Sequence, residues 1–239
     1  MVVLALSSTS LGIQEIRGFA MKTVSPRQLL ITFIPSISFL VVMAVVSVLF
    51  QVSMPAMTGD VTALAKIHPL SGILSNLGVL LWCAAASICV FAAMVLRNVE
   101  PRETFWFLFS SALLSAYLLF DDFFLFHEEL AFRYLGLNQK VVYAALGIAV
   151  CAYIIAFRRV LLRTKFGVLL LALGFLAASV VMDAILEPWL LRLGHWEYFF
   201  EDGAKWLGIA SWCSYYVHTS YQLLVSTFGL PSNAIQSHA

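Results

Sequence analysis

Long apolar runs separated by short polar connections dominate the pattern of residues along this chain. Six runs of about 20 residues carry few charges, and an α-helix needs about this length to cross the roughly 30 Å hydrocarbon layer of a bilayer. The six predicted helices cover Leu29–Phe50, Gly72–Leu96, Thr104–Phe126, Val141–Phe157, Phe166–Leu186 and Ala204–Val225. The pattern therefore predicts an all-α fold, a polytopic membrane bundle of about six transmembrane helices.

The composition excludes an ordinary water-soluble protein. Of the 239 residues, 62% are hydrophobic and 11% are charged, and the mean hydropathy is +0.93, whereas soluble domains are roughly one-quarter charged. The apolar runs leave no room for a separate extramembrane core. We therefore expect one transmembrane domain over residues 28–226, preceded by a segment of residues 1–27 and followed by a short cytoplasmic tail of residues 227–239.

The first 20 residues lack the basic start, apolar core and small-residue cleavage site of a signal peptide. Met21 opens the sequence MKTVSPRQLL, which looks like a natural bacterial start. Residues 1–20 are therefore interpreted either as an amphipathic segment or as the product of an upstream start.

Basic residues gather in alternate connections and so predict the direction of the helices. Arg97 and Arg102 lie between the second and third runs, and four basic residues between Arg158 and Lys165 lie between the fourth and fifth. Because Lys and Arg are retained on the cytoplasmic side, these connections and both termini are expected inside a bacterial inner (plasma) membrane. The net charge of +1 gives no argument for nucleic acid. The expected partners are the lipid bilayer and either another membrane protein or a second copy of the chain.

Acidic residues gather at the opposite, outer ends of the third, fifth and sixth runs. Asp122 lies 18 residues after Thr104, and Asp183 lies 17 after Phe166, so each is about 26 Å along a helix from the inner end. Ionisable groups at a membrane boundary are costly unless they pair, bind a cation or reach water. The candidate polar cluster consists of Asp121, Asp122, His127, Glu128, Asp183, Glu187, Glu201 and Lys205.

Helical spacing predicts which of these residues share a face. Ser111, Ser115, Asp122 and Glu129 fall on one face of a continuous helix. A second face carries Ser179, Asp183 and Glu187, at successive intervals of four residues.

In the sixth run, Lys205 could neutralise one carboxylate. The small Gly208 would let a neighbouring helix approach closely.

Two interpretations of the acidic cluster stay open. The acids could form an interhelical polar network that clamps the third, fifth and sixth helices, or they could form a ligand site. As a metal site, Asp122, His127, Asp183 and Glu201 could hold a divalent cation. Carboxylate oxygens alone suit calcium, magnesium or manganese, and an added histidine favours zinc or iron.

Other chemistries find little support in the sequence. His127 is not part of an HExxH motif, no GxSxG nucleophile motif occurs, and no lysine lies in the middle of a predicted span. The reaction, if any, stays open.

Two segments carry a resemblance to known proteins. DDFFLFHEE at residues 121–129 and EDGAKWLGIASWCSYY at residues 201–216 resemble a group of bacterial and cyanobacterial multi-pass membrane proteins with no established activity. That resemblance implies a membrane fold and a special role for Asp121, Asp122, His127, Glu128, Glu201 and Lys205. The Ser, Asp and His residues are also loosely similar to those of the ceramidase and progestin-receptor membrane hydrolases. The chain departs from that pattern, because Gln222 stands where HxxxH would need a second histidine after His218.

The leading hypothesis is an inner-membrane protein whose outer acidic and histidine cluster forms a cation-dependent or proton-linked site. The alternative is a structural or assembly subunit of a membrane complex. Further alternatives are a membrane-embedded metal hydrolase and a small-solute transporter.

Overall fold

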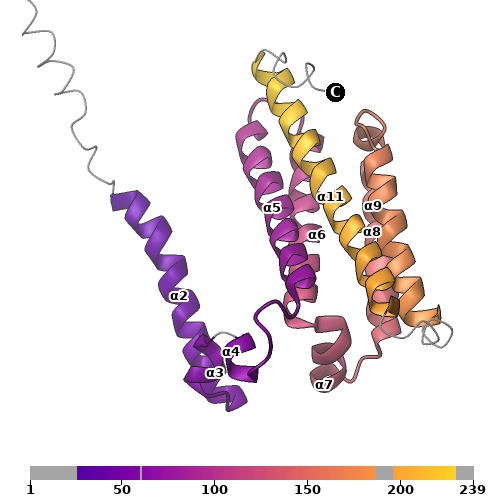
Figure 1. Cartoon of the computed structure of the whole chain (residues 1–239). Coiled ribbons are helices and arrows are strands. Elements are labelled where there is room, and N and C mark those ends of the chain that lie inside the picture. Colours follow the sequence, from indigo (N-terminus) through magenta and orange to yellow (C-terminus); the bar gives the residue numbers. More distant parts are fainter. Residues whose placement is uncertain (1–25, 60, 187–195, 230–239) are drawn as a thin grey trace, which may run out of the picture. The chain divides into compact units, whose positions relative to one another are not determined.

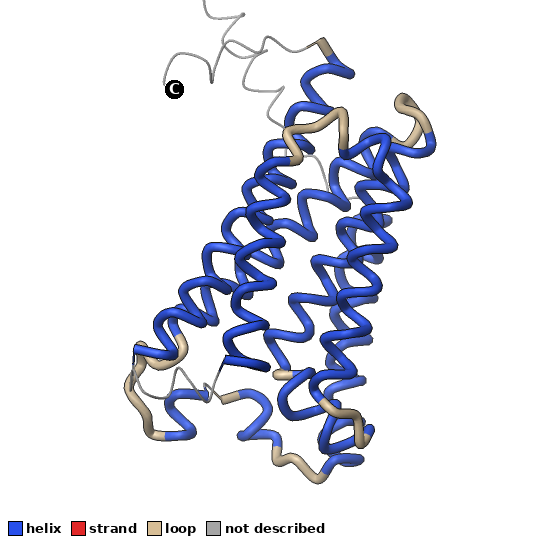
Figure 2. The backbone as a smooth tube through the Cα atoms, turned by 90° about the vertical axis from the view of Figure 1, so that its right-hand side faces the viewer, coloured by secondary structure: helices blue, strands red, loops and turns tan. Residues whose placement is uncertain are grey.

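The computed structural model describes residues 26–59, 61–186 and 196–229, and within these ranges the chain forms helices and loops but no β-strand (Figure 2). The predicted all-α class is therefore confirmed for this part of the chain. The chain divides into two compact units, Met1–Ser71 and Gly72–Ala239.

Within its described residues, the first unit contains one long helix and two short ones, which are labelled in Figure 1. α2 spans Pro26–Phe50, α3 spans Met54–Thr58 and α4 spans Val61–Ala65. α2 ends where Gln51 adopts a left-handed conformation with φ of 55°. No residue of the stretch Phe33–Phe50 is buried within the structure, so the unit leaves the apolar side chains of α2 uncovered.

The second unit is an up-and-down bundle of five long helices. These are α5 (Ile73–Leu96), α6 (Arg102–Phe124), α8 (Gln139–Leu161), α9 (Gly167–Val181) and α11 (Trp196–Phe228). Successive long helices run in opposite directions (Figure 1). The short helix α7 (Ala131–Leu135) and the π-helical turns η1 (Phe126–Leu130) and η2 (Met182–Leu186) lie at the ends of α6 and α9.

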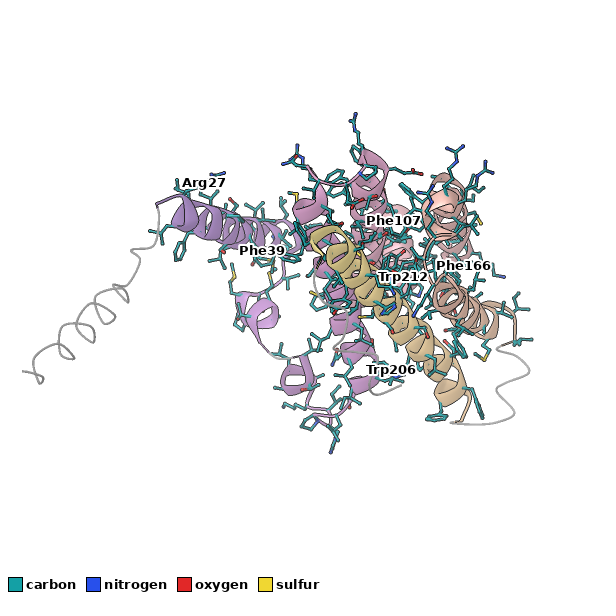
Figure 3. The ribbon with its side chains drawn as sticks, turned by 90° about the horizontal axis from the view of Figure 1, so that it is seen from above. Arg27, Phe39, Phe107, Phe166, Trp206 and Trp212 are labelled. Carbon is teal, nitrogen blue, oxygen red and sulfur yellow. The ribbon has the colours of Figure 1, made fainter. Side chains whose placement is uncertain are left out.

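The core of the bundle lies where α11 packs against α5 and α9 and where α5 packs against α6. Phe107 of α6 and Trp212 of α11 are fully buried and lie among the helices (Figure 3). α5 contributes mainly small side chains such as Ala85, Cys89 and Ala92, which let the helix axes approach closely.

The predicted role of Gly208 is confirmed by its neighbours. A Cβ atom at this position would lie 2.7 Å from Cγ of Leu176 in α9 and 3.0 Å from the Leu176 backbone nitrogen. The close packing of α9 against α11 therefore depends on a residue without a side chain.

Helices cover most of each of the six predicted apolar runs, but the bounds of the helices differ from the prediction. α2, α5, α6 and α8 are long and apolar enough to cross a membrane, judged by length and composition. The α-helical part of α9 has only 15 residues, because η2 follows at Met182. α11 has 33 residues but is rich in Ser, Tyr and charged side chains at its start. The predicted number of six spans is therefore not confirmed.

Three local signals shape the connection between α6 and α8, which carries part of the candidate site. α6 stops at Leu125, which adopts a left-handed conformation with φ of 51°. α7 ends at Gly136 with φ of 63°, a conformation that glycine adopts without steric cost. The Asn138 side chain then accepts a hydrogen bond from the backbone N–H of Lys140 at 2.9 Å and caps the start of α8.

Candidate functional site

The candidate site lies at the end of the bundle where α6 and α9 end and where α8 and α11 begin. A pocket of about 130 Å³ opens there between these helices. Seven of the eight residues of the predicted polar cluster line it, and the eighth, Glu187, lies outside the described residues. The seven are Asp121, Asp122, His127, Glu128, Asp183, Glu201 and Lys205.

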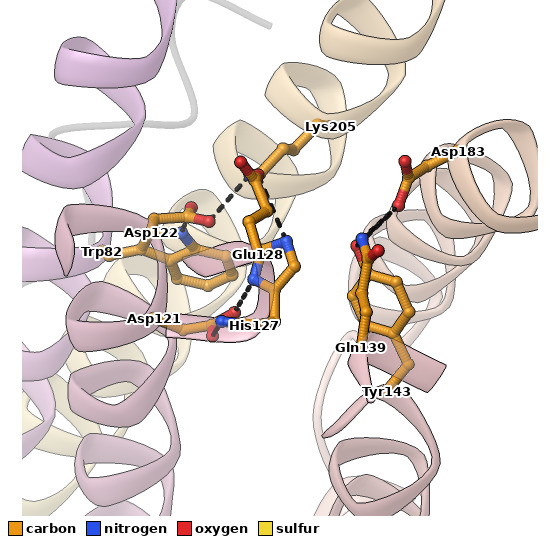
Figure 4. A network of polar contacts seen from close by, with 9 residues as sticks. All are labelled: Trp82, Asp121, Asp122, His127, Glu128, Gln139, Tyr143, Asp183 and Lys205. Carbon is orange, nitrogen blue, oxygen red and sulfur yellow. Dashed lines mark hydrogen bonds and ion pairs between the residues drawn. The ribbon is translucent and has the colours of Figure 1, made fainter. Parts of the chain in front are cut away.

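Asp122 connects three helices. One carboxylate oxygen accepts a hydrogen bond from the indole N–H of Trp82 in α5 at 2.7 Å. The other forms an ion pair with Nζ of Lys205 in α11 at 2.8 Å. Lys205 thus neutralises a carboxylate of another helix, and the contacts join α5, α6 and α11 (Figure 4).

Asp121 holds the turn that follows α6. Its Oδ1 accepts a hydrogen bond from the backbone N–H of His127 at 3.0 Å, and its Oδ2 lies 2.7 Å from Nδ1 of the same histidine. Both side chains are 7% exposed. The left-handed Leu125 and the wider η1 turn allow this arrangement, because they fold the chain back toward the last turn of α6.

The charge of His127 follows from its two acidic neighbours. Burial lowers the pKa of His127, but the hydrogen bonds to Asp121 and Glu128 outweigh this effect and raise it to about 9. In return, the hydrogen bond from His127 lowers the pKa of Glu128, whose Oε1 lies 3.4 Å from Nε2. At neutral pH the ring is therefore an imidazolium that donates to both carboxylates.

Asp183 has a different set of partners. Its Oδ2 accepts hydrogen bonds from the Tyr143 hydroxyl at 2.8 Å and from Nε2 of Gln139 at 2.9 Å. Both donors are neutral and come from the first turns of α8. The rings of Tyr143 and His127 lie 5.0 Å apart between centroids, so this group faces the Asp121–His127 pair across the pocket (Figure 4).

Ser179 lies one helical turn before Asp183. Its side chain lines the pocket and the residue is 7% exposed, yet its hydroxyl has no hydrogen-bond partner among the described residues. Ser111 and Ser115 in α6 behave differently, since each hydroxyl donates to the carbonyl four residues earlier, at 2.6 and 2.8 Å. Serine hydroxyls in helices commonly donate to such a backbone carbonyl. The Ser179 hydroxyl does not, and it can therefore bond to a partner in the pocket.

The balance of charge in the pocket is strongly negative. Asp202 of α11 joins the five predicted acids, so among the described lining residues six acidic side chains face two basic ones, Lys205 and His127. When all of these groups are ionised, the excess is four negative charges. Such an arrangement favours a positively charged ligand or the uptake of protons.

The four predicted metal ligands, Asp122, His127, Asp183 and Glu201, all line the pocket. Nevertheless, no three His, Cys, Asp or Glu side chains come together as a metal-ligating group within the described part of the chain. Two of the four are held by other partners. Trp82 and Lys205 engage Asp122, and Asp121 engages Nδ1 of His127.

One predicted face is wrong. Ser111 and Ser115 are buried in α6, whereas Glu129 is exposed and does not line the pocket. The helix breaks at Leu125, so the spacing of seven residues from Asp122 to Glu129 does not place the two on one face.

Three residues of the site were not anticipated from the sequence, namely Trp82, Gln139 and Tyr143. Trp82 lies in the middle of an apolar run, where an indole is expected without any polar role. Gln139 and Tyr143 are four residues apart, a spacing that puts them on one helical face. That spacing could have indicated a shared polar face on α8, but it does not reveal Asp183 as the partner of Gln139 and Tyr143.

The described part of the chain is all-helical, with four helices of membrane-crossing length, and its second unit carries a polar pocket at one end of the bundle. Residues 37–219 match the model of a domain of unknown function, DUF8692, and the chain belongs to this family. No curated protein and no solved structure matches the chain.

Proposed function

We propose that the protein is a multi-pass protein of the bacterial inner membrane whose acidic pocket is a proton-linked binding site for an organic cation. The excess of carboxylates over basic groups around one pocket carries this proposal. A primary ammonium group is the expected ligand group, because it offers one positive charge and three N–H donors.

Several observations support a membrane location. Large apolar side chains are exposed along α5, α6, α8 and α9 within the second unit, for example Leu80, Phe91, Leu113 and Ile148. Soluble monomers rarely expose apolar surface of this extent. Polar side chains such as Ser111 and Thr219 are buried instead, which is the distribution expected of helices that pack in lipid.

The number and direction of the spans are part of the proposal. α9 and η2 together cover 20 residues, Gly167–Leu186, which is about 30 Å of helix. α11 packs between α5 and α9, so neighbouring helices cover much of its polar surface. We therefore count both as spans, with the basic connections after α5 and α8 in the cytoplasm and the acidic pocket outside.

Cysteine labelling of whole cells tests this direction. In a variant with Cys83, Cys89, Cys151 and Cys213 replaced by alanine, single cysteines are introduced at Thr164 and at Leu137. A membrane-impermeant maleimide should label the cysteine at 137 in intact cells and the one at 164 only after lysis. Labelling at 164 in intact cells would overturn the proposed direction.

Asp183 is the expected contact for the ligand. Its two hydrogen bonds come from neutral groups and both reach Oδ2, so its negative charge is not balanced by an ion pair among the described residues. Together with the open hydroxyl of Ser179, it offers acceptors to an ammonium group.

Thermal unfolding in lipid nanodiscs tests the site with ethylammonium chloride as the probe. At constant ionic strength the protein should become saturably more stable, by about 2.7 kcal/mol at a hundredfold excess over Kd. Asp183→Asn should weaken binding at least tenfold. Glu129→Gln removes an equal charge from an exposed position outside the pocket, and it should leave binding unchanged.

Two further arms complete the experiment. Binding should weaken as the pH falls into the range in which carboxylates take up protons, because protonation removes the negative charge that attracts the ligand. Mg²⁺ and Zn²⁺ are titrated in parallel, and saturation by a metal that is lost in Asp183→Asn would replace the organic cation with a metal. Absence of saturation by any of these cations would overturn the proposed function.

The clamp of Trp82, Asp122 and Lys205 favours the structural alternative for part of the cluster. These contacts join three helices and occupy both oxygens of Asp122. If the whole cluster is structural, Asp183→Asn should lower stability in the absence of any cation, and ethylammonium should bind neither form.

A further inference from the structure

A second and larger cavity runs along the side of the bundle between α6 and α8. This groove has a volume of about 620 Å³. The α8 wall is made largely of alanine, with Ala145, Ala149, Ala152 and Ala156 at intervals of three or four residues. Because these side chains end at Cβ, the wall leaves space that larger residues would fill.

The groove and the acidic pocket are neighbours. Leu146 of α8 lines both of them. Below this residue the groove continues to Phe157, and the 12 residues from Ala145 to Phe157 extend about 18 Å along the helix. This is close to half of the roughly 30 Å hydrocarbon thickness of a bilayer, so the groove has about the length of one lipid leaflet.

The two cavities have opposite chemistry. The groove is lined mainly by apolar side chains, such as Leu113, Leu114 and Phe157. The pocket offers carboxylates and the hydroxyl of Ser179, a residue that is 7% exposed and whose side chain makes no hydrogen bond within the described residues, so this hydroxyl can bond to a polar ligand atom. A ligand that filled both would need a hydrocarbon chain joined to a positively charged, hydrogen-bonding head.

We propose that the pocket and groove together bind a membrane amphiphile with a single hydrocarbon chain and an ammonium headgroup. This inference rests on the proposed function, because the head occupies the proposed cation site. The chain lies along the alanines of α8, and the ammonium group lies between Ser179 and Asp183. A phosphate-bearing headgroup is disfavoured, because its negative charge would meet six acidic side chains.

The test compares amphiphiles of equal chain length on the full-length protein in nanodiscs. Tetradecylamine, tetradecanol and tetradecanoate are added at the same mole fraction of lipid, and bound molecules are counted by native mass spectrometry. Tetradecylamine should occupy the protein at least ten times more strongly than the alcohol or the acid. Equal occupancy by all three would overturn the selection by charge.

Variants of α8 distinguish binding of the hydrocarbon chain from binding of the ammonium headgroup. The double variant Ala149→Leu, Ala152→Leu fills the groove and should lower tetradecylamine occupancy at least tenfold, while ethylammonium binding stays unchanged. Ala144→Leu is the matched control, because Ala144 is exposed on the same helix and does not line the groove. Ser179→Ala should weaken tetradecylamine and ethylammonium alike.

The outcomes distinguish failure of this inference from failure of the proposed function. If ethylammonium binds but the chain adds no affinity, or if filling the groove has no effect, the amphiphile is overturned and the cation site stands. If neither amine binds, both proposals fall.

Discussion

The two sides of the acidic pocket hold their carboxylates in different ways. On the α6 side, Asp121 and Asp122 pair with the charged groups of His127 and Lys205. On the α9 side, Asp183 accepts hydrogen bonds from neutral donors, Gln139 and Tyr143. The charge-paired side joins helices and turns to one another, whereas the neutral-donor side keeps its negative charge available.

This difference shows that an acidic cluster need not have a single role. A buried charge without a partner destabilises the folded state, so removal of Lys205 or His127 should lower the free energy of unfolding. Removal of the Asp183 charge leaves only neutral donors behind. The charge-paired side should therefore control stability, and the neutral-donor side should control binding.

The largest effect is expected from Lys205→Met. This substitution leaves the carboxylate of Asp122, which is 9% exposed, without its ion pair. The free energy of unfolding should fall by about 3 kcal/mol, measured by denaturant or thermal unfolding in detergent. The control Lys140→Met changes an exposed lysine outside the pocket and should alter stability by less than about 0.5 kcal/mol. Equal losses of stability in the Lys205→Met and Lys140→Met variants would show that the ion pair with Asp122 does not stabilise the fold.

The second-largest effect is expected in the pH dependence of the free energy of unfolding. The pKa of His127 is raised to about 9 in the folded protein, so the folded state binds this proton more tightly than the unfolded chain, whose His pKa is about 6.5. The resulting stability is fully present below about pH 6.5 and is lost as the pH rises through about 9. Unfolding curves from pH 6 to pH 10 should show this loss, and Asp121→Asn should reduce it.

A smaller effect on folding is expected from Asp183→Asn. The asparagine oxygen can still accept from Tyr143 and Gln139, so the free energy of unfolding should change by about 1 kcal/mol or less. Ethylammonium binding should nevertheless weaken at least tenfold. A loss of stability as large as that of Lys205→Met would show that both sides of the pocket are structural.

The smallest effect is expected from Glu129→Gln. Glu129 belongs to the same acidic run of the sequence as Glu128, but it is exposed and outside the pocket. Its substitution should change stability by less than about 0.5 kcal/mol and should leave ethylammonium binding intact. A clear effect on either measurement would mean that the pocket extends beyond its described lining.

Much of the fold could be predicted because apolar runs of 20 residues have few alternatives to a helix. The gathering of Asp121, Asp183 and Lys205 could also be anticipated, since each lies near the predicted outer end of its helix. The pairing could not, because spacing along one helix says nothing about which neighbour lies opposite. Lys205 was expected to neutralise one carboxylate, but its sequence position did not show that this carboxylate would be Asp122 of α6.

The break at Leu125 was equally hidden, since nothing in DDFFLFHEE announces a left-handed residue. Leucine has no special tolerance for positive φ, and a glycine or asparagine would have given a signal. The contacts of Asp121 with His127, six residues later, stabilise the turn there. For the same reason Glu129 was placed on the wrong face.

Leu125 has a mechanical consequence for the pocket. A leucine in the left-handed region costs roughly 1–2 kcal/mol relative to a helical conformation, and Asp121 opposes this cost by its two contacts with His127. Asp121 thus stabilises a strained turn through its contacts with His127. Loss of these contacts would favour a continuous helix through residues 125–130, and this helix would move His127 and Glu128 away from the pocket together.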